Sequence, residues 1–163
     1  METILASKKK SAKSTTVISP EQLLTHWQGH RGVTRKVIEA FPEQELFNYS
    51  VGGMRPFAQL AMEIIGMAVP GIEGIISGKW ESGATTFNRT CPPTKVELLK
   101  LWDETTGKIE ELWPQIPPHR FQDVDVAFGL YEGPLYFSLF YWIDNEIHHR
   151  GQGYVYLRSL GIE

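Results

Sequence analysis

Four long stretches of this sequence carry apolar residues at helical spacing, and prolines or glycines stand at their borders. Ser19-Pro20-Glu21 is a typical helix start, because a capping side chain precedes a proline at the first helical position. The stretches begin and end at about residues 20–41, 55–77, 94–113 and 134–160. Four amphipathic helices around one core predict an all-α, up-down four-helix bundle.

Two features interrupt this regular pattern. Pro70-Gly71 lies inside the second stretch, where we expect it to kink the helix or divide it in two. The third connection, residues 117–133, is long for a bundle and contains Phe121, Val124, Val126 and Phe128 in rough alternation. This alternation predicts a short strand or hairpin just before the last helix.

Charge is distributed unevenly along the 163 residues. The whole chain has 16 Lys and Arg against 19 Asp and Glu, a net charge of −3, yet residues 1–16 hold four lysines and one glutamate. We therefore predict a disordered basic tail at residues 1–17 and one acidic bundle domain at residues 18–163. An acidic body gives no electrostatic reason to bind nucleic acid.

Three features of the sequence bear on the cellular compartment: the number of cysteines, the N-terminal segment and the most apolar stretch. Cys91 is the only cysteine, so no intrachain disulfide can form, and the N-terminus lacks the apolar segment of a signal peptide. Polar residues and a proline interrupt the most apolar stretch, residues 57–76, which argues against a membrane span. We expect a cytoplasmic protein with no membrane partner.

The last helix carries two polar residues on its apolar stripe. The residues at helical spacing are Leu135, Leu139, Trp142, Asn145, His149, Gly153, Tyr156 and Leu160. Asn145 and His149 are four residues apart, so their side chains lie one above the other and could share a ligand. Burying an amide and an imidazole requires partners. These partners are either a metal ion in the bundle core or a mutual hydrogen bond that fixes the helix register.

Glu63 is a matching anomaly in the second helix. Met62 and Ile64 flank it, and Leu60 and Met67 lie on its own face. A carboxylate among so many apolar residues requires a metal, a cation or a proton, unless it lies at the edge of the stripe and reaches solvent. Together with Asn145 and His149, it predicts a convergent cluster.

Two other arrangements offer weaker alternatives. His26 and His30 are four residues apart on the first helix, but no third ligand accompanies them, so we interpret them as a structural pair. Cys91 would be a nucleophile if His119 lay beside it. Nothing in the sequence places them together, and an unreactive thiol is the default.

Aromatic residues are dense between Tyr131 and Tyr156. A helix that is apolar on nearly every side must be covered on nearly every side. Phe137, Phe140 and Tyr141 therefore predict a homodimer interface, whereas Trp142 and Tyr156 line the internal site. The alternative is that residues 117–133 fold over the additional apolar surface.

A specific signature closes the chain. His148-His149-Arg150-Gly151-Gln152, followed by Tyr154-Val155-Tyr156-Leu157-Arg158 and Leu160-Gly161, closely resembles the end of DinB-like proteins. Phe57-Ala58-Gln59-Leu60-Ala61, before Glu63, is similar to the second-helix segment of that family. The resemblance covers residues 18–163.

This resemblance implies a four-helix bundle, often dimeric, with a divalent metal held by three histidines. By position, His149 is the last of these ligands, whereas Asn145 and Glu63 stand where the family has the other two histidines. Glu63 can ligate well, but a neutral amide is a poor zinc ligand. The site could hold zinc, nickel or manganese, or it could be empty with Glu63 hydrogen-bonded to His149. Arg150 and Gln152 belong to the signature as supporting or packing groups.

Two functions follow. The first is a metal-dependent hydrolase or thiol transferase that acts on a small-molecule or thiol substrate, with Glu63, Asn145 and His149 around the metal. The second is a non-catalytic dimeric bundle that has lost metal binding and serves a structural or small-ligand-binding role. The bundle by itself cannot separate them, because function lies in the site.

Overall fold

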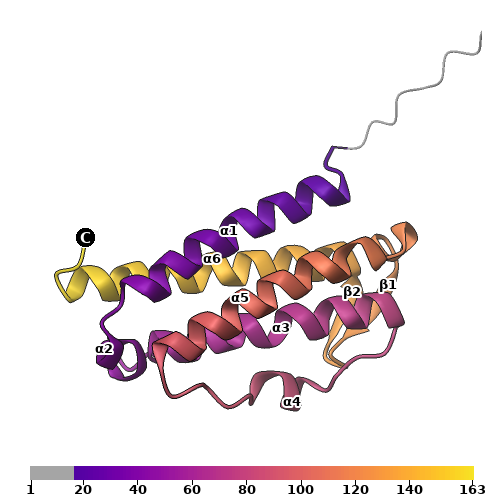
Figure 1. Ribbon diagram of the computed structural model, residues 1–163. Helices are drawn as coiled ribbons and strands as arrows, with labels where there is room; N and C mark the ends of the chain where they lie inside the picture. The colour runs from indigo at the N-terminus through magenta and orange to yellow at the C-terminus, as the bar shows by residue number, and fades with distance from the viewer. Residues whose placement is uncertain (1–16) are drawn as a thin grey trace, which may run out of the picture.

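The computed structural model describes residues 17–163, so the predicted tail lies outside the described residues except for its last position. Figure 1 shows the predicted bundle of four long helices. These helices are α1 (Pro20–Ala40), α3 (Phe57–Ser77), α5 (Lys95–Leu112) and α6 (Leu135–Ser159). Shorter elements join them: α2 (Glu43–Asn48), α4 (Gly83–Phe87), the 3₁₀ turns η1 (Trp113–Gln115) and η2 (Pro118–Phe121), β1 (Val124–Ala127) and β2 (Tyr131–Pro134).

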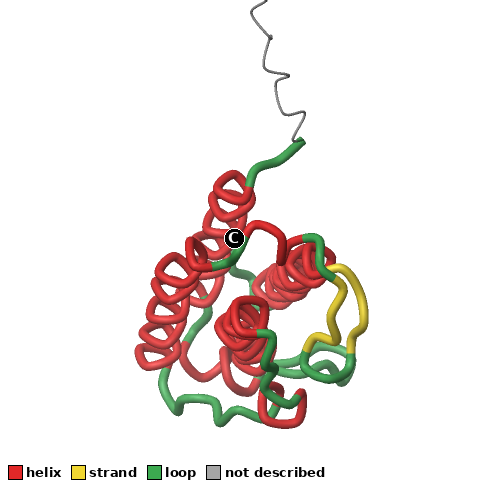
Figure 2. The backbone as a smooth tube through the Cα atoms, turned by 90° about the vertical axis from the view of Figure 1, so that its right-hand side faces the viewer, coloured by secondary structure: helices red, strands yellow, loops and turns green. Residues whose placement is uncertain are grey.

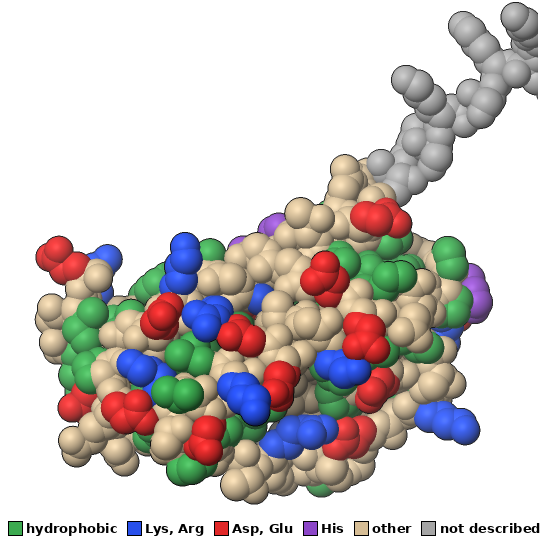
Figure 3. Space-filling model, viewed as in Figure 1, with side chains coloured by type: hydrophobic (Ala, Val, Ile, Leu, Met, Phe, Trp, Pro, Cys, Tyr) green, Lys and Arg blue, Asp and Glu red, His purple; other side chains and the backbone are tan. Residues whose placement is uncertain are grey.

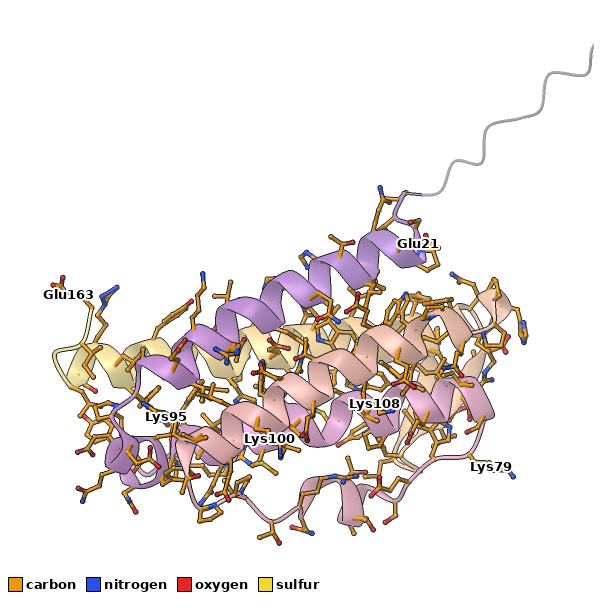
Figure 4. The ribbon with its side chains drawn as sticks, viewed as in Figure 1. Glu21, Lys79, Lys95, Lys100, Lys108 and Glu163 are labelled. Carbon is orange, nitrogen blue, oxygen red and sulfur yellow. The ribbon has the colours of Figure 1, made fainter. Side chains whose placement is uncertain are left out.

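Local sequence signals set the helix starts. Ser19 and Gln22 form a reciprocal capping box at the start of α1, with each side chain bonded to the other residue's backbone amide. Thr94 caps α5 in the same position and accepts from the amide of Glu97. Lys95, labelled in Figure 4, then donates from its ammonium group to the carbonyl of Phe41 at 2.7 Å, which joins the start of α5 to the end of α1.

Contacts between the long helices show in which direction each one runs. The Trp102 indole donates to the carbonyl of Arg31, and the Trp113 indole donates to that of Pro20, so α5 runs opposite to α1. Thr34, further along α1, binds Glu146 of α6, whereas Trp27 packs on Trp142, so α1 and α6 run the same way. Residues 78–94 span the length of the bundle and return the chain to the end where α3 begins (Figure 1).

Helix α3 continues through its internal proline. Pro70 removes one amide donor, yet the helix is assigned without interruption from Phe57 to Ser77, so the expected division does not occur. Val96, an apolar residue in the first turn of α5, does not belong to the buried face of that helix, because 74% of its surface is exposed.

The predicted hairpin is present before α6. Strands β1 and β2 pair antiparallel with Ala127 opposite Tyr131, and Figure 2 shows the pair along one side of the bundle. The alternating valines are not its buried face, because Val124 and Val126 are exposed whereas Ala127 and Phe128 are buried. The hairpin therefore contributes its tip region to the core.

The core consists of two apolar clusters at the two ends of the bundle. One cluster is rich in tryptophan and lies beside the hairpin, with Trp27, Trp113 and Trp142 at its centre. The other packs Phe41, Phe57, Trp102 and Tyr156 near the α1–α2 corner. Polar side chains of α1, α3 and α6 lie between the clusters along these helices: Arg31, Thr34, Glu63, Asn145, Glu146, His149 and Arg150. The candidate site is part of this polar layer.

Candidate functional site

Close contact between α3 and α6 positions the site. A Cβ on Gly71 would lie 2.4 Å from the Trp142 ring, and a Cβ on Gly153 would lie 2.5 Å from the Phe57 ring. Larger residues at these two positions would therefore push the helices apart. Glu63 lies between these two contacts on α3 and faces α6.

The structure brings together the three residues that the sequence singled out. Glu63 Oε1 is 3.0 Å from His149 Nε2 and 3.2 Å from Asn145 Nδ2, and Nδ2 is 3.3 Å from Nε2. Their atoms form a nearly equilateral triangle at the α3–α6 contact. That these residues ligate a metal stays a prediction.

Gln152 orients the imidazole. Its Oε1 lies 2.7 Å from His149 Nδ1, so Nδ1 carries a proton and donates it to this amide oxygen. His149 Nε2 then points at the Glu63 carboxylate. Metal-binding histidines commonly show this arrangement, in which an acceptor on one ring nitrogen fixes the tautomer and aims the other nitrogen.

Glu63 lies in a strongly favourable field for its charged form. Contact with His149 and, second, the guanidinium of Arg55 lower its pKa to about 2. The Arg55 guanidinium binds the outer carboxylate oxygen of Glu63, Oε2. The Tyr156 hydroxyl donates a hydrogen bond to the backbone carbonyl of Arg55 at 3.0 Å. Glu63 is therefore an anion at neutral pH, and Oε1 faces the site.

These residues fit a divalent cation. Nitrogen and oxygen ligands bind such ions at about 2.0–2.2 Å, and neighbouring ligands are then about 3 Å apart, as Glu63 Oε1 and His149 Nε2 are at 3.0 Å. The Asn145 amide presents Nδ2 to these two atoms, so it would have to turn to ligate through Oδ1, a buried atom with no hydrogen-bond partner in the described part of the chain. One carboxylate, one amide oxygen and one imidazole make an oxygen-rich set. Within residues 17–163, no three His, Cys, Asp or Glu side chains cluster, so the candidate site depends on the amide.

A second polar cluster, which was not predicted from the sequence, lies between α1 and α6. Arg31 of α1 and Glu146 of α6 are fully buried, with Arg31 Nη1 3.8 Å from Glu146 Oε2. Thr34 and Trp27 donate to the two Glu146 oxygens at 2.6 and 3.3 Å. Arg31 continues Trp27, and Glu146 continues Trp142, at the four-residue spacing of a buried face, and this signal could have found both residues.

The histidine pair of α1 belongs to that second cluster. His26 Nε2 and His30 Nε2 lie 3.2 Å apart, and Arg150 Nη2 is 3.0 Å from His30 Nδ1. Burial and the Arg150 charge lower the pKa of His30. Because the Arg150 guanidinium already contacts Nδ1, the second ring nitrogen of His30, this geometry supports a structural pair.

Cys91 and His119 lie in different parts of the molecule. Cys91 lines a cavity of about 450 Å³ together with Arg55 and Glu63. His119 lies in η2 with Nε2 3.8 Å from Asp123. Burial raises the pKa of the Cys91 thiol, which disfavours the nucleophilic thiolate.

The aromatic face of α6 is only partly covered. Phe137, Phe140 and Tyr141 expose 64%, 37% and 47% of their surfaces, and the Tyr131 ring of the hairpin lies 6.4 Å from that of Tyr141. The hairpin thus covers part of this surface, as the alternative interpretation expected. The homodimer stays a prediction.

The surface and the apolar helix agree with the class of protein expected. Figure 3 shows basic and acidic side chains interspersed over the visible face. Within the described residues, α3 is the helix long and apolar enough to cross a membrane, and 72% of its most apolar window is buried in the bundle. This burial is consistent with a soluble protein, whereas the cytoplasmic compartment stays a prediction.

Comparisons with known proteins identify the family. The chain is similar to the crystal structure of a DinB-like protein from Bacillus cereus, with 19% identity, a TM-score of 0.68, and coverage of 88% of this chain and 93% of that one. A DinB-like protein from Bacillus subtilis gives 22% identity and a TM-score of 0.69, covering 87% and 93%. No curated protein matches. Because the family model described as "DinB family" matches residues 10–163, this chain belongs to the DinB family.

Proposed function

We propose that this protein binds a divalent metal ion through Glu63, Asn145 and His149 and acts as a metal-dependent hydrolase or thiol transferase. The observation that carries the proposal is the convergence of the three side chains at 3.0–3.3 Å, together with the unpartnered oxygen of the Asn145 amide, which would face the ion once the amide turns. A small molecule or a thiol is the expected substrate class.

Each residue has a distinct part in this proposal. Glu63 supplies the negative charge, Gln152 holds His149 with Nε2 directed inward, and Arg55 occupies the outer oxygen of Glu63. A bound divalent cation polarises a substrate oxygen or lowers the pKa of water or a thiol. Three protein ligands leave positions open for such a molecule.

The second candidate is a non-catalytic relative. The Asn145 amide donates to one oxygen of Glu63 and Arg55 binds the other, so the carboxylate is satisfied without an ion. In this case the cluster contributes to the α3–α6 packing, and the fold serves a structural or small-ligand role.

Metal analysis of the purified protein separates the two candidates. The parent is loaded with zinc, nickel or manganese, dialysed, and compared with the His149→Ala variant. His148→Ala is the matched control, because His148 is the exposed neighbour on the same helix. We expect stoichiometric metal in the parent and in the control but not in His149→Ala. Absence of metal from the parent after all three loadings would rule out the first candidate.

A gain-of-ligand variant tests the geometry. Imidazole is a better zinc and nickel ligand than a neutral amide, so Asn145→His should raise the affinity for these ions by about tenfold or more. Competition with a chelating dye measures this change. Unchanged affinity would mean that position 145 does not contribute a ligand.

A further inference from the structure

The hairpin encloses a cavity beside the candidate site. This hairpin cavity has a volume of about 310 Å³. Met67 of α3, Phe128 and Tyr131 of the hairpin, and Phe137, Tyr141 and Trp142 of α6 form most of its wall. A dry apolar cavity of about 150 Å³ already holds benzene, and small-molecule pockets begin at about 300 Å³. The space therefore suits one or two fused rings.

The wall of the cavity is largely aromatic, and one of its aromatic residues has an uncommon backbone conformation. Phe128 has φ of 55°, which is uncommon for a bulky residue, and Gly129 follows with φ of 70°. Turns of this kind favour Asn or Gly at both positions. A phenylalanine is retained here with its ring buried, 6.0 Å from the ring of Trp142.

The cavity and the candidate site are neighbours along both helices. Met67 follows Glu63 by one turn of α3, and Tyr141 precedes Asn145 by one turn of α6, so each pair shares a helix face. Burial raises the pKa of Tyr141, the nearby Tyr131 hydroxyl and Glu63 carboxylate raise it further, and a hydrogen bond with the Asn145 side chain lowers it. The Tyr141 hydroxyl thus lies within the field of Glu63.

Asn145 and Glu63 lie one helical turn beyond the cavity wall and are not part of its lining. Asn145 Oδ1 is buried without a partner in the described part of the chain. A ligand that extends from the cavity past Tyr141 would satisfy this amide oxygen with a hydrogen-bond donor.

We propose that the hairpin cavity binds the aromatic or branched apolar part of a small molecule, whose hydroxyl or thiol end extends past Tyr141 toward Asn145 and Glu63. That this molecule is a substrate rests on the function proposed above. Binding in the cavity does not require the metal, so the two proposals can fail separately.

The probe is 2-naphthol, an apolar bicycle with one hydroxyl, titrated by calorimetry into the full-length protein. Ser138 lines the cavity, so Ser138→Leu should fill it and weaken binding by at least tenfold. Phe137→Ala should also weaken binding, whereas Phe140→Ala is the matched control, because Phe140 lines a separate groove near α1. Circular dichroism verifies that each variant folds. The proposal would be overturned if 2-naphthol did not bind the parent, or if it bound Ser138→Leu and Phe137→Ala as tightly as the parent.

Two further measurements separate the alternatives. His149→Ala should lose metal yet bind 2-naphthol within about threefold, whereas Asn145→Ala should lose about two- to tenfold in affinity, the range of one hydrogen bond. Light scattering tests whether a second copy of this chain occupies the cavity instead. If Phe137→Ala converts a dimer to a monomer and 2-naphthol also dissociates that dimer, a second copy fills the cavity and the small-molecule proposal is wrong.

Discussion

Two polar clusters meet on helix α6, one residue apart, and they differ in exposure. Glu146 faces α1, where its carboxylate and the Arg31 guanidinium are fully buried. Asn145 and His149 face α3, where 22% of the Glu63 side chain is exposed and cavities lie on both sides. We call them the closed cluster and the open cluster.

The difference concerns the exposure of the charged groups. In the closed cluster, both Glu146 oxygens accept hydrogen bonds, and Arg31 stacks on Trp102 with its guanidinium carbon 4.0 Å from the ring centroid. Each cluster holds one buried atom without a hydrogen-bond partner, Arg31 Nη1 in the closed cluster and Asn145 Oδ1 in the open one. Only the open cluster also has a partly exposed carboxylate, and an exposed charged group can bind a ligand, whereas a fully buried pair fixes packing.

The largest expected effect is in the closed cluster. Glu146→Leu leaves the Arg31 charge buried without its carboxylate, so we expect a loss of about 3–5 kcal/mol in the free energy of unfolding. Urea denaturation followed by circular dichroism measures it. Metal content per folded chain should not change.

The paired control removes both charges. Arg31→Met with Glu146→Leu should cost clearly less than Glu146→Leu alone, because no charge is left unpaired in the core. If the single and double variants lose the same stability, the ion pair contributes nothing and the closed cluster is ordinary packing.

A smaller effect is expected when the support of the open cluster is removed. Gln152→Ala takes away the acceptor of His149 Nδ1, so metal affinity should fall by about tenfold. The unfolding free energy should change by less than about 1 kcal/mol. Gln44→Ala, on α2 far along the chain, is the control. Unchanged metal affinity in Gln152→Ala would show that this contact does not orient a ligand.

The smallest effect is a pH dependence of opposite sign in the two clusters. The Glu63 pKa of about 2 lies below its unfolded value, so its stabilising contribution is complete above about pH 4.5 and is lost toward pH 2. Burial raises the pKa of Glu146 instead, so its contribution increases as the pH falls through that raised pKa toward about 4.5.

Glutamine variants test how each glutamate contributes to the pH dependence of the unfolding free energy. Between pH 5 and pH 2.5, Glu63→Gln should lose about 1 kcal/mol less stability than the parent, a modest difference because solvent screens a partly exposed pair. Glu146→Gln should differ from the parent in its pH dependence only above about pH 4.5. Thermal unfolding across this range measures both variants, and differences of the same sign from the parent would contradict the assignment.

Much of the fold could be predicted from local signals. Ser19, Thr94 and the bordering prolines act within one or two turns of chain, so the four long helices lie close to their predicted bounds. The hairpin was predicted too, but its buried residues were not. Its valines face solvent because tertiary packing selected Ala127 and Phe128 for the core.

The open cluster was predictable because Glu63, Asn145 and His149 interrupt apolar stripes. The closed cluster was missed for a different reason. Arg31 and Glu146 continue buried helix faces at four-residue spacing, but a charged residue at such a position usually reaches solvent, and only a partner 115 positions away makes their burial tolerable. No local pattern reports such a pairing.

The sequence by itself determined the helices and their apolar faces. It also determined that Glu63, Asn145 and His149 lie on the apolar faces of α3 and α6, because helical periodicity is a local property. Only the tertiary structure decided which polar residues meet, that an arginine and a glutamate are buried together, and that the hairpin leaves an aromatic cavity beside Asn145. Those outcomes depend on contacts between distant segments, where desolvation and packing are balanced in three dimensions.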